Sequence, residues 1–98
     1  MKQLSCVYKS GKLLKINLIY DEEQNRIHSI FISGDFFLHP EETLEEIERN
    51  LSGARADEDT IRQKVGQSLA GSQPFGFDAR SLSTAILLCL NQDANIAS

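Results

Sequence analysis

The sequence predicts an α+β domain in which a three-stranded antiparallel sheet is followed by three helices that pack on one face of the sheet. Two observations lead to this fold class. Between residues 4 and 33, apolar side chains alternate with polar ones in three short runs, as in half-buried strands. Beyond residue 42 they recur every three or four positions, as in helices with one buried face. No internal repeat or low-complexity linker divides residues 1–98, so we expect a single domain.

Three strands are expected at residues 4–10, 12–21 and 26–33. A short turn containing Gly11 separates the first two, which is typical of a hairpin. The connections are short enough for an antiparallel meander, and Gly34 ends the sheet. The side chains expected to share one face are Leu14, Ile16, Leu18 and Tyr20 in the second strand, and Ile30 and Ile32 in the third.

Two helices are expected to follow the sheet. Pro40 fits the first turn of a helix, where its missing N–H group has no cost, and Gly53 stops that helix. The second helix begins near Asp57 and continues up to Gly71. The acidic side chains of "PEETLEEIE" are expected to form a solvated face. The apolar positions of the two helices are Leu44, Ile47 and Leu51, then Ile61, Val65 and Leu69.

A third helix is expected at the end of the chain. The segment "GSQPFGF" reads as a loop, and Asp78 after it is a good N-cap. Residues 83–90 of this helix carry no charge. They must therefore be mostly buried, either in the core of this chain or against another chain.

Composition and charge exclude several classes of function. The content of 41% hydrophobic and 24% charged residues is ordinary for a soluble globular protein. No apolar run approaches the roughly 18 residues of a membrane span, and no signal peptide opens the chain, so we expect no membrane association. The net charge of −4 argues against nonspecific binding of nucleic acid. Cys6 and Cys89 lack metal-site spacing and read as reduced packing residues, so we expect a cytoplasmic protein.

The basic residues are concentrated at the start of the sequence. The first twenty residues carry four lysines and no acidic residue, so all fourteen acidic residues lie in the remainder. Two interpretations stay open, a solvated strand face or a docking face for an acidic partner. Under the second interpretation the candidate interface residues are Lys9, Lys12 and Lys15.

The sequence shows no pattern that predicts catalysis by this chain alone. It contains neither G-x-G-x-x-G nor a Walker motif. All three predicted helices begin with acidic residues, which complement the helix dipole and would repel a phosphate. His28 and His39 lack a carboxylate nearby in sequence that would orient them, and neither cysteine lies in a polar loop. We therefore expect no catalytic residue, bound cofactor or metal ligand in this chain.

The segment "GDFF" contains three further candidates. A short carboxylate such as that of Asp35 can accept backbone N–H bonds in a turn, and we favour this role over contact with a partner. Phe36 and Phe37 point in opposite directions if the segment is extended. One of them is expected to close the core, and the other is then available to a partner.

Several segments together resemble the C-terminal accessory domain of lipoate–protein ligases. "GKLLKI" is similar to a family strand of the type G-L-[LI]-K-V, and "IHSIFISGDFF" is similar to I-x-x-I-x-I-x-G-D-F-F. "PEE" at residues 40–42 and the Leu-x-Gly at residues 51–53 are similar to the helix that follows in the family. "FGFDARSLSTAILLCL" is similar to the closing loop and helix. The resemblance spans almost the whole chain.

The resemblance implies a function that composition could not show. In this family the large ligase domain makes lipoyl-AMP from lipoate and ATP, with Mg²⁺ as the expected metal, and then acylates a lysine of a lipoyl carrier domain. In split ligases the small domain is a separate subunit that helps to close the active site of the large one. This chain begins at Met1 and lacks the large domain, so it resembles the small subunit. The expected partners are the large catalytic subunit and, second, the lipoyl carrier domain.

Two other classes of function stay open. The family fold is similar to that of iron–sulfur scaffold and sulfur-carrier proteins, which need exposed thiolates as ligands or nucleophiles. Two separate cysteines in apolar surroundings argue against this alternative. The remaining alternative is a noncatalytic interaction module of unrelated purpose.

Overall fold

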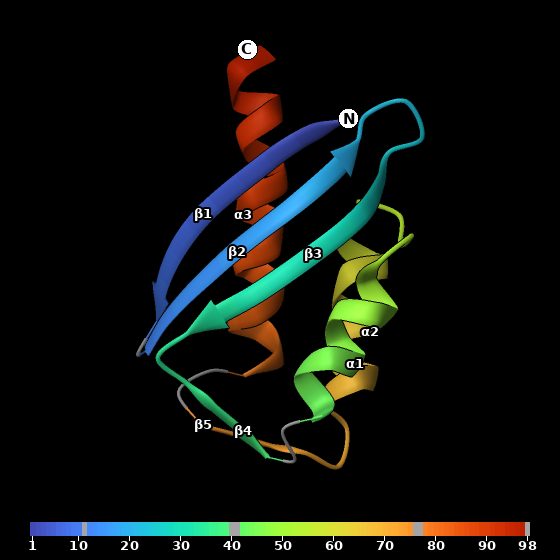
Figure 1. Cartoon of the computed structure of the whole chain (residues 1–98). Coiled ribbons are helices and arrows are strands. Elements are labelled where there is room, and N and C mark those ends of the chain that lie inside the picture. Colours follow the sequence, from blue (N-terminus) through green and yellow to red (C-terminus); the bar gives the residue numbers. More distant parts are fainter. Residues whose placement is uncertain (11, 40–41, 76–77, 98) are drawn as a thin grey trace.

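The protein contains an antiparallel sheet with the strand order β1-β2-β3, as the sequence predicts. The strands are β1 Lys2–Ser10, β2 Lys12–Asp21 and β3 Arg26–Gly34 (Figure 1). β1 pairs with β2 from Lys2 opposite Tyr20 to Ser10 opposite Lys12, which confirms the hairpin. The computed structural model describes residues 1–10, 12–39, 42–75 and 78–97, so the turn residue Gly11 lies outside its described part.

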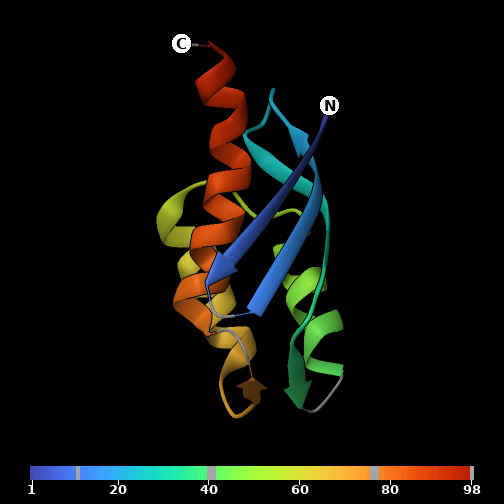
Figure 2. The ribbon, with the colours of Figure 1, turned by 90° about the vertical axis from the view of Figure 1, so that its left-hand side faces the viewer.

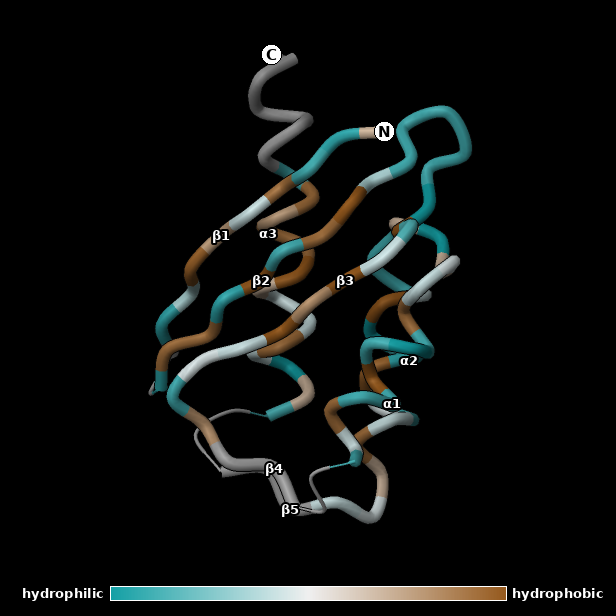
Figure 3. The backbone as a smooth tube through the Cα atoms, in the orientation of Figure 1, coloured by the Kyte–Doolittle hydropathy of each residue, from teal (hydrophilic) through white to brown (hydrophobic). Residues whose placement is uncertain are grey.

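The two faces of the sheet differ in polarity, as the alternation of residues predicts. Along the strands, apolar and polar positions follow one another (Figure 3). The core-facing series is buried at Leu14, Ile16 and Leu18, while the neighbouring Lys15 and Asn17 are exposed. The register pairs Ile16 with Ile32 and Leu18 with Ile30, so both strands direct apolar side chains to the same face.

Three helices cover that apolar face. They are α1 Glu42–Leu51, α2 Glu58–Leu69 and α3 Ala79–Ala97. α3 contacts β1 and β2, α1 contacts β3, and α2 packs against both other helices. Figure 1 looks onto the face of the sheet that has no helix in front of it, and Figure 2 shows the helices on the other side. The order of strands and helices agrees with the prediction, although Pro40 and Glu41, expected in the first helical turn, lie outside the described residues.

The uncharged segment of α3 is buried within this chain. Its side chains at Ala85, Ile86 and Cys89 are 0% exposed, as is Leu82 just before it, and all four belong to the core cluster. Leu88 is the exception within the segment and is 48% exposed. The same cluster contains Ile16, Ile27, Ile47, Leu51, Ile61 and Val65, which come from the sheet and both other helices. Burial within this chain therefore explains most of the apolar composition of this segment, with Leu88 left exposed. No helix among the described residues is long and apolar enough to cross a membrane.

The segments before α1 and before α3 contain a second, small sheet that the sequence analysis missed. β4 Phe37–His39 pairs antiparallel with β5 Gln73–Phe75. The expectation that residues 71–77 form a loop is therefore wrong for β5, and residues 76 and 77 lie outside the described part. Three residues are too short for a period-two pattern to be visible, and the Pro in β5 argued against a strand.

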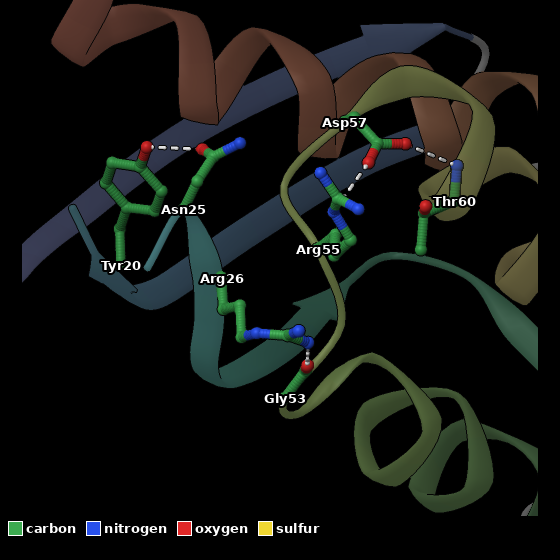
Figure 4. A network of polar contacts seen from close by, with 7 residues as sticks. All are labelled: Tyr20, Asn25, Arg26, Gly53, Arg55, Asp57 and Thr60. Carbon is green, nitrogen blue, oxygen red and sulfur yellow. Dashed lines mark hydrogen bonds and ion pairs between the residues drawn. The ribbon is translucent and has the colours of Figure 1, made fainter. Parts of the chain in front are cut away.

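The connection between α1 and α2 covers the start of β3 at the edge of the sheet. Ile27 donates its backbone N–H to the carbonyl oxygen of Ala54 (2.9 Å), and Gly53 donates to that of Ile27 (2.6 Å). The Arg26 guanidinium adds a bond to the Gly53 carbonyl (2.9 Å; Figure 4). Farther along β3, the amide of Ile32 donates to Glu48 Oε2 on α1 (2.8 Å). The expectation that the acidic side chains of this helix are solvated is therefore wrong for Glu48, because its carboxylate accepts from a backbone N–H at the edge of the sheet.

Candidate partner interface

The described residues contain no constellation that could carry a reaction or hold a metal. No group of three or more His, Cys, Asp and Glu side chains in this part of the chain could surround a metal ion. His28 is exposed on β3, and the side chain of His39 lies outside the described part. What the described surface can provide is contact with a partner, so the predicted interface residues are considered one group at a time.

The three candidate lysines are all exposed, but they do not share one face. Lys9 and Lys15 belong to the series of strand residues that points away from the helices. Lys12 belongs to the alternate series and lies at the end of the hairpin, opposite Ser10. The structure thus places Lys9 and Lys15 on the open face of the sheet, which is the face that no helix covers, and Lys12 at the end of the hairpin.

The Asp35 turn is held by its backbone rather than by its carboxylate. The amide nitrogen of Asp35 donates to the carbonyl oxygen of Leu13 (3.1 Å). Within the described part of the chain, no hydrogen bond involves the carboxylate, and the residue is exposed. The expected bond from backbone donors to this carboxylate is therefore not observed there. The exposed carboxylate stays a candidate for contact with a partner.

Gly34 explains why the chain can turn so sharply before Asp35. Its φ of +150° lies in a region of backbone conformation that residues other than glycine rarely adopt. A Cβ atom at this position would lie 2.0 Å from the Leu13 carbonyl oxygen, which is far inside van der Waals contact. The glycine thus allows β2 and the turn to approach each other closely.

The structure describes the side chain of only one of the two phenylalanines after Asp35. Phe36 is half-buried and packs against the core cluster, as expected for one member of the pair. Phe37 begins β4, but its side chain lies outside the described part. Its proposed contact with a partner stays a prediction.

The N-termini of α2 and α3 are occupied by carboxylates, as predicted for these two helices. Asp57 Oδ1 accepts from the Thr60 amide (2.8 Å), and Arg55 lies 3.6 Å from the same carboxylate (Figure 4). Asp78 Oδ1 accepts from the Ser81 amide (2.7 Å). The backbone hydrogen bond from Thr60 holds the pKa of Asp57 below its ordinary value, and that from Ser81 does the same for the pKa of Asp78. Negative charge at these positions opposes binding of a phosphate.

The fold brings together the two cysteines, which are far apart in sequence. Cys6 on β1 donates its thiol hydrogen to the carbonyl oxygen of Ala85 (3.5 Å), one helical turn before Cys89 on α3. Hydrogen bonding between the two sulfur atoms lowers the pKa of Cys6, while the same bond and burial raise the pKa of Cys89. Cys89 is completely buried, so it is a packing residue rather than an exposed thiolate.

The sequence analysis did not single out two apolar side chains on the open face of the sheet. Val7 on β1 is 64% exposed, and Phe31 on β3 is 61% exposed. The signal was present in the alternation, because Phe31 lies between Ile30 and Ile32, which face the core. A large apolar side chain at a position that must point away from the helices is typical of a surface that contacts a partner.

Comparisons with known proteins identify the family. The family model described as bacterial lipoate protein ligase C-terminus matches residues 8–84. The lipoate-protein ligase A subunit 2 of Thermoplasma acidophilum is 36% identical over 66 residues, which cover 63% of this chain and 70% of that protein. The resemblance inferred from the "GDFF" and "PEE" segments is thereby confirmed.

A solved structure agrees with both findings. It comes from a structural analysis of an archaeal lipoylation system, a bi-partite lipoate protein ligase and its E2 lipoyl domain, also from Thermoplasma acidophilum. The chain that matches has a TM-score of 0.78 and 28% sequence identity, and the match covers 87% of this chain and 94% of that one. Fold, motifs and relatives agree, and the chain belongs to the family of lipoate protein ligase C-terminal domains.

Proposed function

We propose that this protein is the accessory subunit of a bipartite lipoate–protein ligase. In this role it binds a large catalytic subunit and supports formation of lipoyl-AMP from lipoate and ATP, which precedes transfer to a lysine of a carrier protein. The observation that carries the proposal is the match to subunit 2 of the Thermoplasma acidophilum ligase. ATP, lipoate and Mg²⁺ are assigned to the partner subunit, and the lipoyl carrier domain is a second, weaker candidate partner.

The structure of the chain is consistent with an accessory role. Its described residues form one core with no catalytic constellation, and Asp57 and Asp78 occupy the N-termini of two helices. We therefore assign it no nucleotide site of its own. The paired cysteines are free thiols, which suits a reducing compartment such as the cytoplasm.

A subunit without chemistry of its own can act by changing the conformation of its partner. If it binds the closed form of the active site more tightly than the open form, it shifts the population toward the closed form. Formation of the adenylate requires ATP and lipoate to be held together while water is excluded. Stabilising the closed form is therefore expected to assist this step most.

The proposal is tested by mixing this protein with its catalytic subunit. Complex formation is measured by isothermal titration calorimetry, and adenylation by the release of pyrophosphate from ATP in the presence of lipoate. We expect a one-to-one complex, no pyrophosphate release by this chain alone, and a large increase when it is added to the catalytic subunit. Full adenylation by the catalytic subunit alone, unaffected by this protein, would contradict the proposal.

The sulfur-transfer alternative is not favoured by the site geometry. It needs a thiolate at the surface, whereas Cys89 is completely buried and its pKa is raised. Cys6 has a lowered pKa, but it is half-buried and its thiol donates to the Ala85 carbonyl oxygen inside the fold. A Cys6→Ser, Cys89→Ala variant that keeps its fold by circular dichroism should support adenylation as the wild type does. Loss of activity in the folded variant would favour sulfur chemistry instead.

A further inference from the structure

The open face of the sheet carries large exposed apolar side chains on both outer strands, with the polar Lys15 and Asn17 of β2 between them. The register places Phe31 of β3 opposite Asn17 of β2, and Asn17 opposite Ser5 of β1. Val7 lies opposite Lys15 in the adjacent row, and both Val7 and Phe31 are more than 60% exposed. Phe31 also lines a shallow depression together with Gln3, Asn17, Ile19 and Ser29. Large exposed apolar side chains that share a strand face are typical of an interaction surface.

The charge of this face has one sign. Its positions are Gln3, Ser5, Val7 and Lys9 on β1, Leu13, Lys15, Asn17 and Ile19 on β2, and Ser29, Phe31 and Ser33 on β3. We call this set the open face. It contains two lysines and no carboxylate. The carboxylate of Asp21, at one end of β2, is bound to the turn amides of Glu23 and Gln24 (3.1 and 3.2 Å).

Helix α1 has the opposite character, because Glu42, Glu45 and Glu46 are exposed there beside one exposed base, Arg49. On α2, Glu58 and Asp59 are balanced by Arg62 and Lys64. The molecule therefore presents a basic, partly apolar face on the sheet and acidic side chains on α1. This asymmetry decides which kind of partner fits the open face, because like charges across an interface are unfavourable.

We infer that the open face is the surface that docks the catalytic subunit, against an apolar patch flanked by carboxylates. This inference rests on the proposed function and specifies its interface. A symmetric pair of copies joined at this face would bring Lys9 and Lys15 of one copy against the same lysines of the other. Docking of the open face onto the acidic α1 of a second copy would be head-to-tail, and such contacts form filaments unless they close into a ring. A different chain with acidic groups is the partner that avoids both outcomes.

The test measures binding of the catalytic subunit by calorimetry with four variants. Phe31→Thr removes the apolar ring but keeps a residue that favours strands, and Lys15→Glu reverses a charge on the same face. Leu88→Thr is the matched apolar control, because Leu88 is 48% exposed on α3, and Arg80→Glu is the charge control on the same helix. Thermal melts confirm that each variant is folded.

We expect Phe31→Thr to weaken binding about tenfold or more, as for an aromatic side chain that becomes buried on binding. Lys15→Glu should weaken it several-fold at low salt and less as the salt concentration rises. Both controls should bind as the wild type does. If Phe31→Thr and Lys15→Glu both bind with wild-type affinity, the assignment of the docking surface is wrong, but the proposed function stands. The same conclusion follows if only the two control variants lose binding. Absence of binding by the wild-type protein would overturn both this inference and the proposed function.

A second measurement tests whether the open face binds a second copy of this chain instead of the catalytic subunit. Sedimentation equilibrium of the protein alone should show a monomer, for the wild type and for Phe31→Thr. Association of the wild type that Phe31→Thr abolishes would show that the open face binds a second copy, and would overturn the assignment to the catalytic subunit.

Discussion

At the scale of single residues, the turn after β3 depends on Gly34 and on the backbone of Asp35. The Leu13 carbonyl oxygen accepts from the Asp35 amide at 3.1 Å, and this bond requires β2 to approach the turn closely. The Gly34 backbone makes the approach possible, because a side chain there would collide with the same carbonyl oxygen. The carboxylate of Asp35 has no part in these contacts, so the stability of the turn and the chemistry of its side chain can be separated by mutation.

Gly34→Ala should lower the free energy of unfolding by about 1–3 kcal/mol, the range for a residue forced into a rare backbone conformation. Gly66→Ala in α2 is the matched control, since nothing lies within 4 Å of a Cβ atom built there. It should raise the free energy of unfolding by about 0.5–1 kcal/mol, because alanine favours a helix. Urea denaturation measures both changes. Equal effects of the two substitutions would show that the close approach at Gly34 is not needed.

Asp35→Ala should change the free energy of unfolding by no more than about 0.5 kcal/mol, as expected for a substitution at an exposed side chain. Asp35→Asn should behave in the same way. The measurement is thermal unfolding of both variants beside binding to the catalytic subunit. A loss of stability in Asp35→Ala that Asp35→Asn restores would show that the side chain accepts backbone hydrogen bonds after all.

At the scale of elements, α2 and α3 are each fixed by a cap and a buried face. α2 begins after Asp57, whose carboxylate accepts from Thr60, and it buries Ile61, Val65 and Leu69. α3 begins after Asp78, which exchanges hydrogen bonds with Ser81 in both directions. Each cap thus satisfies a backbone donor that the helix itself leaves without a partner.

The caps should make stability depend on pH. The pKa values of Asp57 and Asp78 are lower in the folded protein than in the unfolded chain, where an aspartate titrates near pH 3.9. Their contribution is therefore fully present above the unfolded pKa and is lost as the pH falls through the folded pKa. The double variant Asp57→Asn, Asp78→Asn still caps both helices but does not titrate there. Between about pH 6 and pH 3 it should lose less stability than the wild type in urea denaturation.

Asp59→Asn is the control for this measurement, because Asp59 is exposed in the first turn of α2 and is not its N-cap. It should follow the wild-type pH profile more closely than the double variant does. A double variant with the wild-type profile would mean that the caps do not contribute to the acid sensitivity of the fold.

At the scale of the whole molecule, most of the architecture was predictable because it rests on patterns that one segment displays by itself. The alternation from Leu14 to Leu18, the spacing of Ile61 and Val65, and the cap at Asp78 each carry their own signal. β4 and β5 were missed because each is only three residues long and is defined by pairing with the other. The association of Cys6 with Cys89 was missed for the same reason, since only packing of α3 on β1 brings them together.

The placement of the candidate interface residues in the fold was predictable in part, while their contact with a partner stays a prediction. Sequence composition identified Lys9 and Lys15, but it also selected Lys12, which belongs to the other strand series. Phe31 was visible in the alternation, yet its importance depends on how much of it stays exposed once the helices are placed. The resulting surface has apolar side chains on both outer strands and lysines beside them, and it lies on the side of the sheet opposite the helices. It is a property of the assembled sheet.

The most direct test of the account compares two starting points for carrier lipoylation by the catalytic subunit. One reaction starts from lipoate and ATP, the other from synthetic lipoyl-AMP, and each is run with and without this protein. We predict that omission of the protein abolishes most lipoylation from lipoate and ATP but has a much smaller effect from lipoyl-AMP, because the activated intermediate is then already formed. An equal loss in both reactions, or no loss in either, would contradict a role in adenylation.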